Sequence, residues 1–592
     1  MSVDSFKYLF TPELLDGRLV SDISTTSQKD GALKRDEDSA PDPSSKPARR
    51  TSPPRWQTIE YFLYYAVFII VIPQMFKAAY EISKEDHPNY LRYSSILSNG
   101  WIPGRKVDNT DLQYKGFRDH VLILFVVVAA HTGLRKLCTN VLRSADLQTR
   151  SVFDNIFAVI FLLVLHGISY FKILALLATN YGILKALGPS KATPFVTWGF
   201  NLMMLLLNEW KRGYMFGRLL GPDYAYIDSQ YGGLMPRWEV HFNLTMLRVI
   251  SFNMDYYWAL TTGPDLERRK RPPPSHQSDK DRVATAHPLD LYKFSIYHAY
   301  CLYSPLYLAG PIITFNDFVA QNIHAAFKPL SSTAFKPVLL YGIRFLLSLL
   351  CMELVLHFCY VQAISKASHA PYLAWINDTP FQIMMIGYFN LHIIWLKLLI
   401  PWRFFRLWSL IDSIDPPENM LRCMSDNYSA VGFWRGWHRS FNRWNIRYIY
   451  IPLGGSKKRA VFNTLVVFTF VALWHDLSFT LLTWGWLIVL FILPELTARA
   501  LLPYSKYGGN WWYRPLAAMG GTLTVLTMCV ANLIGFALGL DGIKMLIYDG
   551  IINAGWAGAA FLGGTIGCLF VGINVMFELR EEEARRGLFL GC

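Results

Sequence analysis

Apolar segments recur along most of this 592-residue chain, and they constrain its fold more than any other feature. A run of roughly 20 apolar residues can cross a bilayer as an α-helix, because the helix satisfies every backbone polar group internally. Hydrophobic residues make up 52% of the chain and charged residues only 17%, which excludes the set of soluble domains that the length alone would indicate. The sequence therefore predicts an all-α, polytopic membrane protein.

We expect roughly 10–12 transmembrane or re-entrant helices around a central tunnel. The apolar segments lie at about residues 59–76, 121–134, 152–165, 170–184, 193–207, 338–361, 381–400, 461–474, 477–493, 515–538 and 557–577. Segment 240–258 is less apolar, and we expect it at the membrane interface or partway across. Segment 292–313 is interrupted by proline and glycine, which indicates a re-entrant element. Several segments are short, as expected where helices line a cavity.

The composition divides the chain into three regions. Residues 1–55 are rich in Ser, Thr, Asp, Pro and Lys and are predicted to be a disordered tail. Residues 56–118 hold the first transmembrane helix and a polar cap segment, and residues 119–592 form the main membrane domain. A polar loop at 263–288 is expected to be exposed on the cytosolic side.

The charge and cysteine patterns exclude two other classes of protein. The formal net charge is +14, but the basic residues gather between apolar segments, as in cytosolic loops that face acidic lipids. We therefore expect membrane lipid as a partner and no nucleic acid. The eight cysteines show no paired or regular spacing, so the sequence predicts neither a disulfide framework nor a metal site.

One stretch, residues 431–476, has a different pattern. Its first part, VGFWRGWHRSFNRWNIRYIYIPLGG, divides into three strips when it is treated as a single α-helix. The aromatic strip holds Trp434, Trp437, Phe441, Trp444 and Tyr448, the basic strip holds Arg439, Arg443 and Arg447, and the polar strip holds Arg435, His438, Asn442 and Asn445. Such a helix could serve only as an interfacial membrane anchor.

His475 and Asp476 favour a functional site over a simple anchor. They interrupt two apolar segments, and ionisable residues there are costly unless they face a protein interior or a water-filled cavity. Proline and glycines separate His438 from His475, so the two histidines cannot share one helix. If they act together, they must converge across a tunnel.

The available side chains suffice for direct acyl transfer from a thioester to a hydroxyl. The chain has no GxSxG elbow, Walker loop or HExxH motif. We expect His475, buried and neutral, to act as general base, with Asp476 as a weak candidate to orient it. His438 and Asn442 could stabilise the oxyanion, and Arg435 or Arg447 could bind the phosphates of coenzyme A. We expect Trp437 and Trp474 to contact substrate.

The blocks FWRGWHRSFNRW, RYIYIPLGG and LWHD resemble the membrane-bound O-acyltransferase (MBOAT) family. Within that family they are most similar to the glycerol-uptake (Gup) branch and Hedgehog acyltransferase. RVISFNMDYYW at 248–258 and YSPLYLAGPIITFNDF at 303–318 agree with the same resemblance. It implies that His475 is the main catalytic residue and that His438 is the second family position, which is aspartate in Hedgehog acyltransferase. That departure argues against transferring the protein substrate of that enzyme.

The resemblance also implies substrates, a location and a cofactor. It implies acyl-CoA as co-substrate and transfer of a long or very-long-chain acyl group to lyso-GPI lipid during GPI-anchor remodelling, in the endoplasmic reticulum membrane. A protein acceptor, and a polyol (glycerol) transporter or regulator, remain alternatives. We expect no tightly bound cofactor. Hedgehog acyltransferase binds haem through a cysteine, and Cys423 occupies the matching place, but a buried or lipidated thiol is favoured there over a haem ligand.

Overall fold

The computed structural model of the chain is almost entirely helical. It describes residues 11–15, 52–262, 278–327, 332–368, 374–457, 459–475, 477–586, 588 and 590. Most of the predicted tail and the part of the polar loop at 263–277 therefore lie outside the described residues. The described part of the tail includes a short helix, whose Leu14 and Leu15 are buried against Leu340 and Tyr341.

The first half of the chain contains α2 (Pro12–Leu15), α4 (Ile59–Glu81), α5 (Tyr90–Tyr93), α6 (Leu112–Leu142), α7 (Leu147–His166), α8 (Ser169–Leu187), α9 (Ala192–Trp210), α10 (Phe216–Leu219), α11 (Ala225–Gln230), α12 (Trp238–Thr262) and α14 (Asp279–Ala284). The 3₁₀ helices here are η1 (Ser94–Ile96), η2 (Pro222–Tyr224) and η4 (Leu289–Leu291). Two short strands, β1 (Ser98–Asn99) and β2 (Lys106–Val107), pair antiparallel within the predicted polar cap segment.

The second half contains α15 (Phe294–Cys301), α16 (Ser304–Tyr307), α17 (Phe315–Phe327), α18 (Ser332–Phe358), α19 (Val361–Ala367), α20 (Pro380–Ile411), α21 (Ala430–Gly436), α22 (Arg439–Asn445), α23 (Ala460–His475), α24 (Phe479–Leu501), α25 (Tyr504–Tyr507), α26 (Tyr513–Phe536), α27 (Gly539–Ile547) and α28 (Gly555–Arg585). A 3₁₀ turn, η6 (Gly455–Lys457), precedes α23, and two π-helical segments, η5 (Ile446–Tyr450) and η7 (Tyr548–Ile552), follow α22 and α27.

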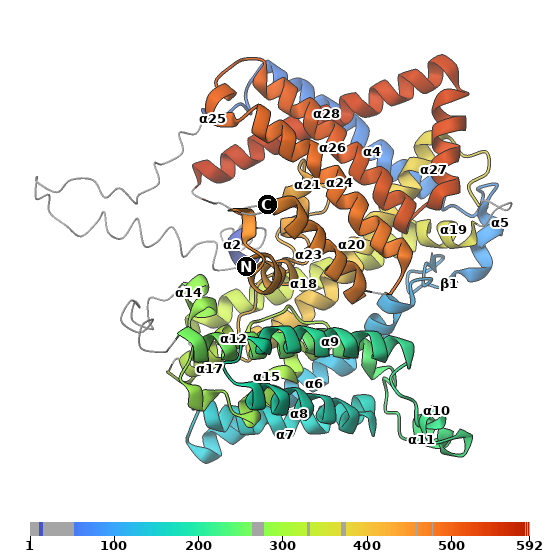
Figure 1. Cartoon of the computed structure of the whole chain (residues 1–592). Helices are drawn as coiled ribbons and strands as arrows, with labels where there is room; N and C mark the ends of the chain where they lie inside the picture. Colours follow the sequence, from blue (N-terminus) through green and yellow to red (C-terminus); the bar gives the residue numbers. More distant parts are fainter. Residues whose placement is uncertain are drawn as a thin grey trace, which may run out of the picture.

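The helices form two groups with a central layer between them (Figure 1). Helices α24, α26 and α28 lie together with α4 at one side, and α6, α7, α8 and α9 lie at the opposite side. Between the two groups lie α18, α20 and the segment from α21 to α23. The chain stretch singled out by its pattern is therefore central to the molecule.

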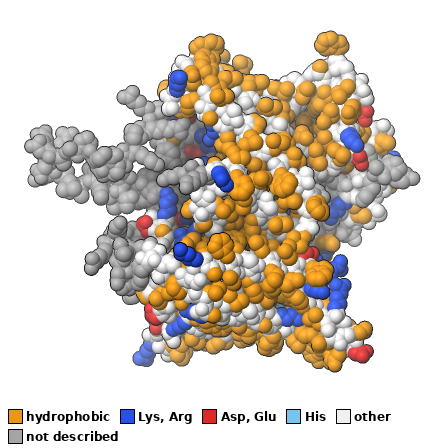
Figure 2. Space-filling view, in the orientation of Figure 1, with side chains coloured by type: hydrophobic (Ala, Val, Ile, Leu, Met, Phe, Trp, Pro, Cys, Tyr) orange, Lys and Arg blue, Asp and Glu red, His pale blue; other side chains and the backbone are white. Residues whose placement is uncertain are grey.

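Eight of the described helices are long and apolar enough to cross a membrane: α4, α6, α7, α18, α20, α24, α26 and α28. They overlap the predicted segments, but most extend further at one or both ends. At the start of α6, for example, the side chain of Asp111 accepts a hydrogen bond from the backbone of Tyr114, ahead of the apolar residues that hydropathy detects. The visible face in Figure 2 is covered mainly by hydrophobic side chains, as lipid contact requires.

Helix α12 decides between two expectations for segment 240–258, which we placed at the membrane interface or partway across the membrane. Helix α12 is among the most buried helices and lies in the core, which does not agree with a position at the interface. Its polar side chains have partners on neighbouring elements: Arg248 donates to the backbone oxygen of Cys301 at 3.0 Å, and Ser251 lies 2.7 Å from the hydroxyl of Tyr448. The low hydropathy of this segment reflects internal hydrogen bonding and not exposure to the interface.

The predicted interruption of segment 292–313 is confirmed. Helices α15 and α16 are short, and an extended stretch beginning at Gly310 joins them to α17. The hydroxyl of Ser440 accepts a hydrogen bond from the backbone nitrogen of Ile312 at 2.9 Å, so this stretch packs directly against α22.

Candidate active site

The stretch around His438 is not the single helix that we predicted. Helix α21 ends at Gly436, Trp437 is extended, and His438 adopts the left-handed conformation with φ 47° and ψ 52°. Helix α22 then begins at Arg439. The turn places the His438 ring in a position that a continuous helix would not give it, and a left-handed residue other than glycine, unusual in proteins, often accompanies function.

A buried asparagine stabilises this break. The backbone oxygen of Asn419 accepts a hydrogen bond from the backbone nitrogen of Arg439 at 3.0 Å, and its side-chain oxygen accepts one from Ser440 at 3.2 Å. These bonds satisfy donors that the start of α22 leaves without intrahelical partners. The prediction failed because it used only the helical period and could not include a residue from another segment.

The His438 side chain lies in an aromatic environment and is only 7% exposed. Its ring stacks on Trp402 of α20 with centroids 4.5 Å apart, and it lies 5.1 Å from the ring of Phe441. Nε2 of His438 is buried and makes no hydrogen bond in the described structure. This nitrogen is therefore available for a ligand.

His438 lies outside the eight helices that could cross a membrane. Burial, with a smaller contribution from the nearby His475, lowers the pKa of its imidazole to about 3. The ring is consequently neutral at physiological pH. A neutral imidazole can still donate one hydrogen bond, which is what an oxyanion requires.

His475 is the last residue of α23 and lies on the wall of a cavity. The cavity is also lined by Leu205 and Asn208 of α9, by Glu209, by Glu239 and Asn243 of α12, and by Leu473, Trp474 and Leu477. We expected a ring buried between two apolar helices, but the His475 side chain is exposed. The helix ends just where hydropathy is interrupted, which leaves the ring open to the cavity.

The rings of His438 and His475 both lie near the ring of Trp474. The ring of Trp474 lies 4.8 Å from that of His475 and 6.3 Å from that of His438. Trp474 is itself held against α12 through Asn243. Two segments far apart in sequence thus meet in one place, and Asp476, the weak orienting candidate, lies outside the described residues.

The other predicted site residues occupy different positions. Trp474 lines the His475 cavity, whereas Trp437 lines a second cavity. Asn442 is half-buried on α22, and Arg435 is exposed. Arg447 pairs with the buried Asp255 at 2.9 Å, so its charge already has a protein partner.

Cys423 lies between α20 and α21, with its sulfur 3.3 Å from the hydroxyl of Ser425. The second cavity is lined by its neighbours Arg422 and Met424 but not by Cys423 itself, and the His475 cavity is not lined by it either. Haem binding through this thiol stays a prediction from the resemblance.

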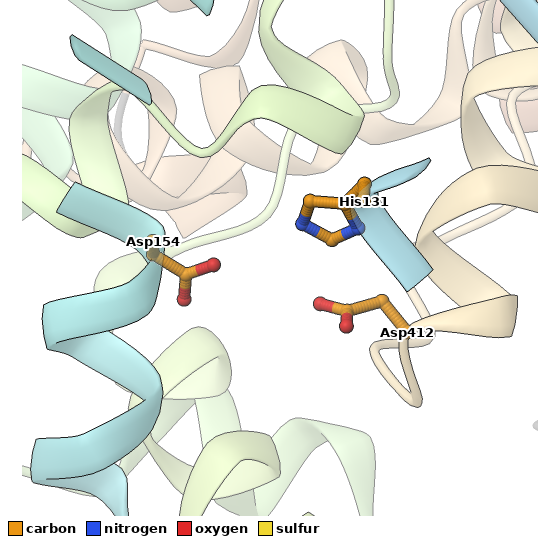
Figure 3. Close-up of side chains that lie close together, drawn as sticks. All are labelled: His131, Asp154 and Asp412. Carbon is orange, nitrogen blue, oxygen red and sulfur yellow. The ribbon is translucent and has the colours of Figure 1, made fainter. Parts of the chain in front are cut away.

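A separate polar cluster lies away from the His475 cavity. His131 of α6, Asp154 of α7 and Asp412 after α20 face one another, with potential ligand atoms within 4.8 Å (Figure 3). Arg135 donates to both carboxylates, at 3.0 Å for Asp412, and Arg150 also pairs with Asp412 at 3.5 Å. Because two guanidinium groups already neutralise these carboxylates, we interpret the cluster as a buried ion-pair network that joins three helices.

Sequence reasoning missed four polar residues of the His475 cavity: Asn208, Glu209, Glu239 and Asn243. Asn208 follows the apolar run MMLLL, and a polar residue at such a position is a recognisable signal. Asn243 belongs to segment 240–258, which we expected at the interface or partway across the membrane, and Glu239 directly precedes that segment. No local pattern indicates that these residues share a cavity with His475.

Known proteins of one family are similar to this chain. The sequence profile of MBOAT, the membrane-bound O-acyltransferase family, matches residues 226–530, which include both histidines. Membrane-bound O-acyltransferase GUP1 of Candida tropicalis is 43% identical over 596 residues, covering 99% of this chain and 95% of that protein. The GUP1 protein of Saccharomyces cerevisiae is 44% identical over 588 residues, covering 97% and 99%.

The name of a more distant relative states a different activity. Protein-cysteine N-palmitoyltransferase HHAT of Mus musculus is 28% identical over 239 residues, covering 39% of this chain and 45% of that protein. The GUP1 relatives, in contrast, align along nearly their whole length. With a family profile across more than half of the chain and full-length relatives above 40% identity, this multi-pass membrane protein belongs to the membrane-bound O-acyltransferase family, within its GUP branch.

Proposed function

We propose that this acyltransferase moves a long or very-long-chain acyl group from acyl-CoA to a hydroxyl of a membrane lipid. The observation that carries the proposal is the position of His475 on a cavity wall, with the rings of both His475 and His438 near the ring of Trp474. One imidazole is accessible to a substrate, and the other has a free ring nitrogen within the same aromatic cluster.

The proposed reaction needs only these groups and the two substrates. His475 accepts the proton of the acceptor hydroxyl while the hydroxyl oxygen attacks the thioester carbonyl. The carbonyl π bond breaks to give a tetrahedral oxyanion, and the neutral His438 ring donates a hydrogen bond to it from Nε2. The carbonyl then re-forms, the carbon–sulfur bond breaks, and the coenzyme A thiolate takes the proton from His475. The products are an ester and free coenzyme A.

The acceptor that we propose is lyso-GPI lipid, and the location is the endoplasmic reticulum membrane. The support is the full-length similarity to the GUP1 proteins, whose branch the sequence resembles. Fluorescence microscopy of the tagged chain beside a marker of the endoplasmic reticulum tests the location. A signal confined to another membrane would contradict it.

The test of the function uses purified protein in detergent with radiolabelled long-chain acyl-CoA and a panel of lysolipids that includes lyso-GPI. Wild type should form labelled ester, and His475→Ala should lower the rate at least about 100-fold. His120→Ala is a matched control, because His120 is an exposed histidine of α6 and does not line the cavity. Equal rates in wild type and His475→Ala would contradict the proposal.

Two alternative functions can be tested with the same variant. The partial similarity to HHAT favours a peptide acceptor as the second candidate, so a peptide with a free N-terminal cysteine belongs in the panel. Labelling of the peptide alone would favour it. For a polyol transporter, glycerol flux into protein-containing vesicles should persist in His475→Ala, whereas the enzyme proposal predicts no protein-dependent flux.

A further inference from the structure

The His475 cavity holds a buried amide without a partner. Asn208 on α9 is 2% exposed, and neither its side-chain oxygen nor its side-chain nitrogen makes a hydrogen bond in the described structure. Leaving a buried amide unpaired is unfavourable, and most buried polar groups in proteins are paired. Because Asn208 lines the cavity together with His475, a ligand there can supply the missing partner.

A second polar group on the same wall limits the chemistry of that ligand. Glu239 of α12 is 6% exposed, and its carboxylate pairs at 3.2 Å with Arg237, whose side chain is 72% exposed. The exposed Glu209 also lines the cavity. The described residues that line it include no lysine or arginine. A phosphate inside this cavity would therefore face the carboxylates of Glu209 and Glu239 and no cation on the cavity wall, because Arg237 does not line the cavity and already pairs with Glu239.

An acyl chain also fits poorly, because it would leave the Asn208 amide unpaired. A hydroxyl fits, since it donates one hydrogen bond and accepts others, which matches both atoms of an amide and the accepting oxygens of a carboxylate. We propose that Asn208 and Glu239 form the acceptor subsite and bind the uncharged, hydroxyl-bearing part of the acceptor beside His475.

This inference rests on the proposed function and assigns one of its two substrates to one cavity. The coenzyme A phosphates, and any phosphate of the acceptor, then lie outside it. The subsite is built from the last turn of α9, the first turn of α12 and the last residue of α23, so three helix ends meet around the reacting hydroxyl.

The kinetic test compares Asn208→Leu and Glu239→Gln with wild type. Both variants should raise the KM for the lysolipid acceptor about tenfold or more and leave the KM for acyl-CoA within about twofold. An increase confined to the KM for acyl-CoA would mean that the cavity holds the donor, and it would overturn the proposal. Unchanged acceptor KM in both variants would overturn it as well.

A stability measurement separates substrate binding from a structural role. Asn208→Leu removes an unpaired amide, so its melting temperature without substrate should equal or exceed that of wild type. The matched control is Asn201→Leu, two turns earlier on α9. Because the Asn201 side chain donates a hydrogen bond to Asn180 at 3.2 Å, this variant should have a lower melting temperature than wild type. If the melting temperature of Asn208→Leu falls as far below that of wild type as the melting temperature of Asn201→Leu does, the proposal is overturned.

Direct binding keeps this inference distinct from the proposed reaction. Thermal shift with a lysolipid and no acyl-CoA should stabilise wild type but not Asn208→Leu. If that result holds while wild type transfers no acyl group, the subsite stands and the proposed function fails. If wild type transfers the acyl group while both proteins bind lysolipid equally, the function stands and the subsite fails.

Discussion

The indole nitrogen of Trp474 donates a hydrogen bond to the backbone oxygen of Asn243 at 3.0 Å, and the Asn243 amide donates back to the backbone oxygen of Trp474 at 3.4 Å. This reciprocal pair joins α12 to the end of α23, one residue before His475. The contact spans 231 residues of sequence. It fixes where α23 ends relative to the cavity and so positions the proposed base.

Trp474→Phe tests the importance of that pair. The phenyl ring keeps most of the packing against Phe441 but cannot donate to Asn243. We expect kcat to fall about tenfold with little change in either KM, because about 1.4 kcal/mol of positioning is lost. Trp486→Phe, an exposed tryptophan on α24 that donates to Thr469, is the control. Equal kcat in both variants would argue against a positioning role.

The effect of replacing His438 should depend on how well the new residue tolerates the left-handed backbone conformation. Asparagine tolerates the left-handed conformation at this position and can still donate a hydrogen bond, whereas alanine does neither well. We expect His438→Ala to lower kcat about 100-fold and to melt at a lower temperature. His438→Asn should retain more activity and melt close to wild type. Steady-state rates and thermal melts of the two purified variants measure this, and a fully active His438→Ala would contradict the proposed oxyanion role.

The lowered pKa of His438 predicts a pH effect on stability. Its pKa is 6.5 in an unperturbed chain and about 3 when folded, so the folded state favours the neutral ring. That stabilisation is complete above pH 6.5 and is lost as pH falls toward 3, with about 2 kcal/mol lost by pH 5. The melting temperature should therefore drop more between pH 7.5 and pH 5 in wild type than in His438→Asn. Identical drops would contradict the assignment.

Arg447 has two competing roles, and one substitution distinguishes them. Its guanidinium pairs with Asp255, which is 1% exposed, so Arg447→Met leaves a buried carboxylate without its cation. We expect destabilisation of about 3–5 kcal/mol, measured as a lower melting temperature, and recovery in the double variant with Asp255→Asn. A stable Arg447→Met protein with a raised KM for acyl-CoA would instead support the predicted phosphate contact.

The network of Asp154, Arg135 and Asp412 should behave as structure and not as a metal site. Asp412→Asn leaves Arg135 and Arg150 with one carboxylate fewer, and we expect a clear loss of thermal stability, about 3–5 kcal/mol. Treatment of wild type with EDTA should not change the melting temperature. A chelator-sensitive melt that Mg²⁺ or Zn²⁺ restores would show that a cation replaces the arginines.

Much of this architecture follows from the sequence by itself. The long helices, such as α4 and α28, are detectable because each contains a continuous run of apolar residues. Hydropathy is a local property that the sequence gives directly. The same is true of the interruption at His475, which lies between two apolar segments. Cap residues such as Asp111 shift the boundaries, because a cap is polar and extends the helix beyond its apolar part.

Only the tertiary structure decided how the site is assembled. The break before α22 depends on Asn419, the position of Trp474 depends on Asn243, and the charge of Arg447 is matched by Asp255, each from a separate segment. Helical periodicity places side chains relative to their own axis and carries no information about which other helix faces them. The cavity is formed where the ends of α9, α12 and α23 meet, and that meeting results from packing across the whole membrane domain.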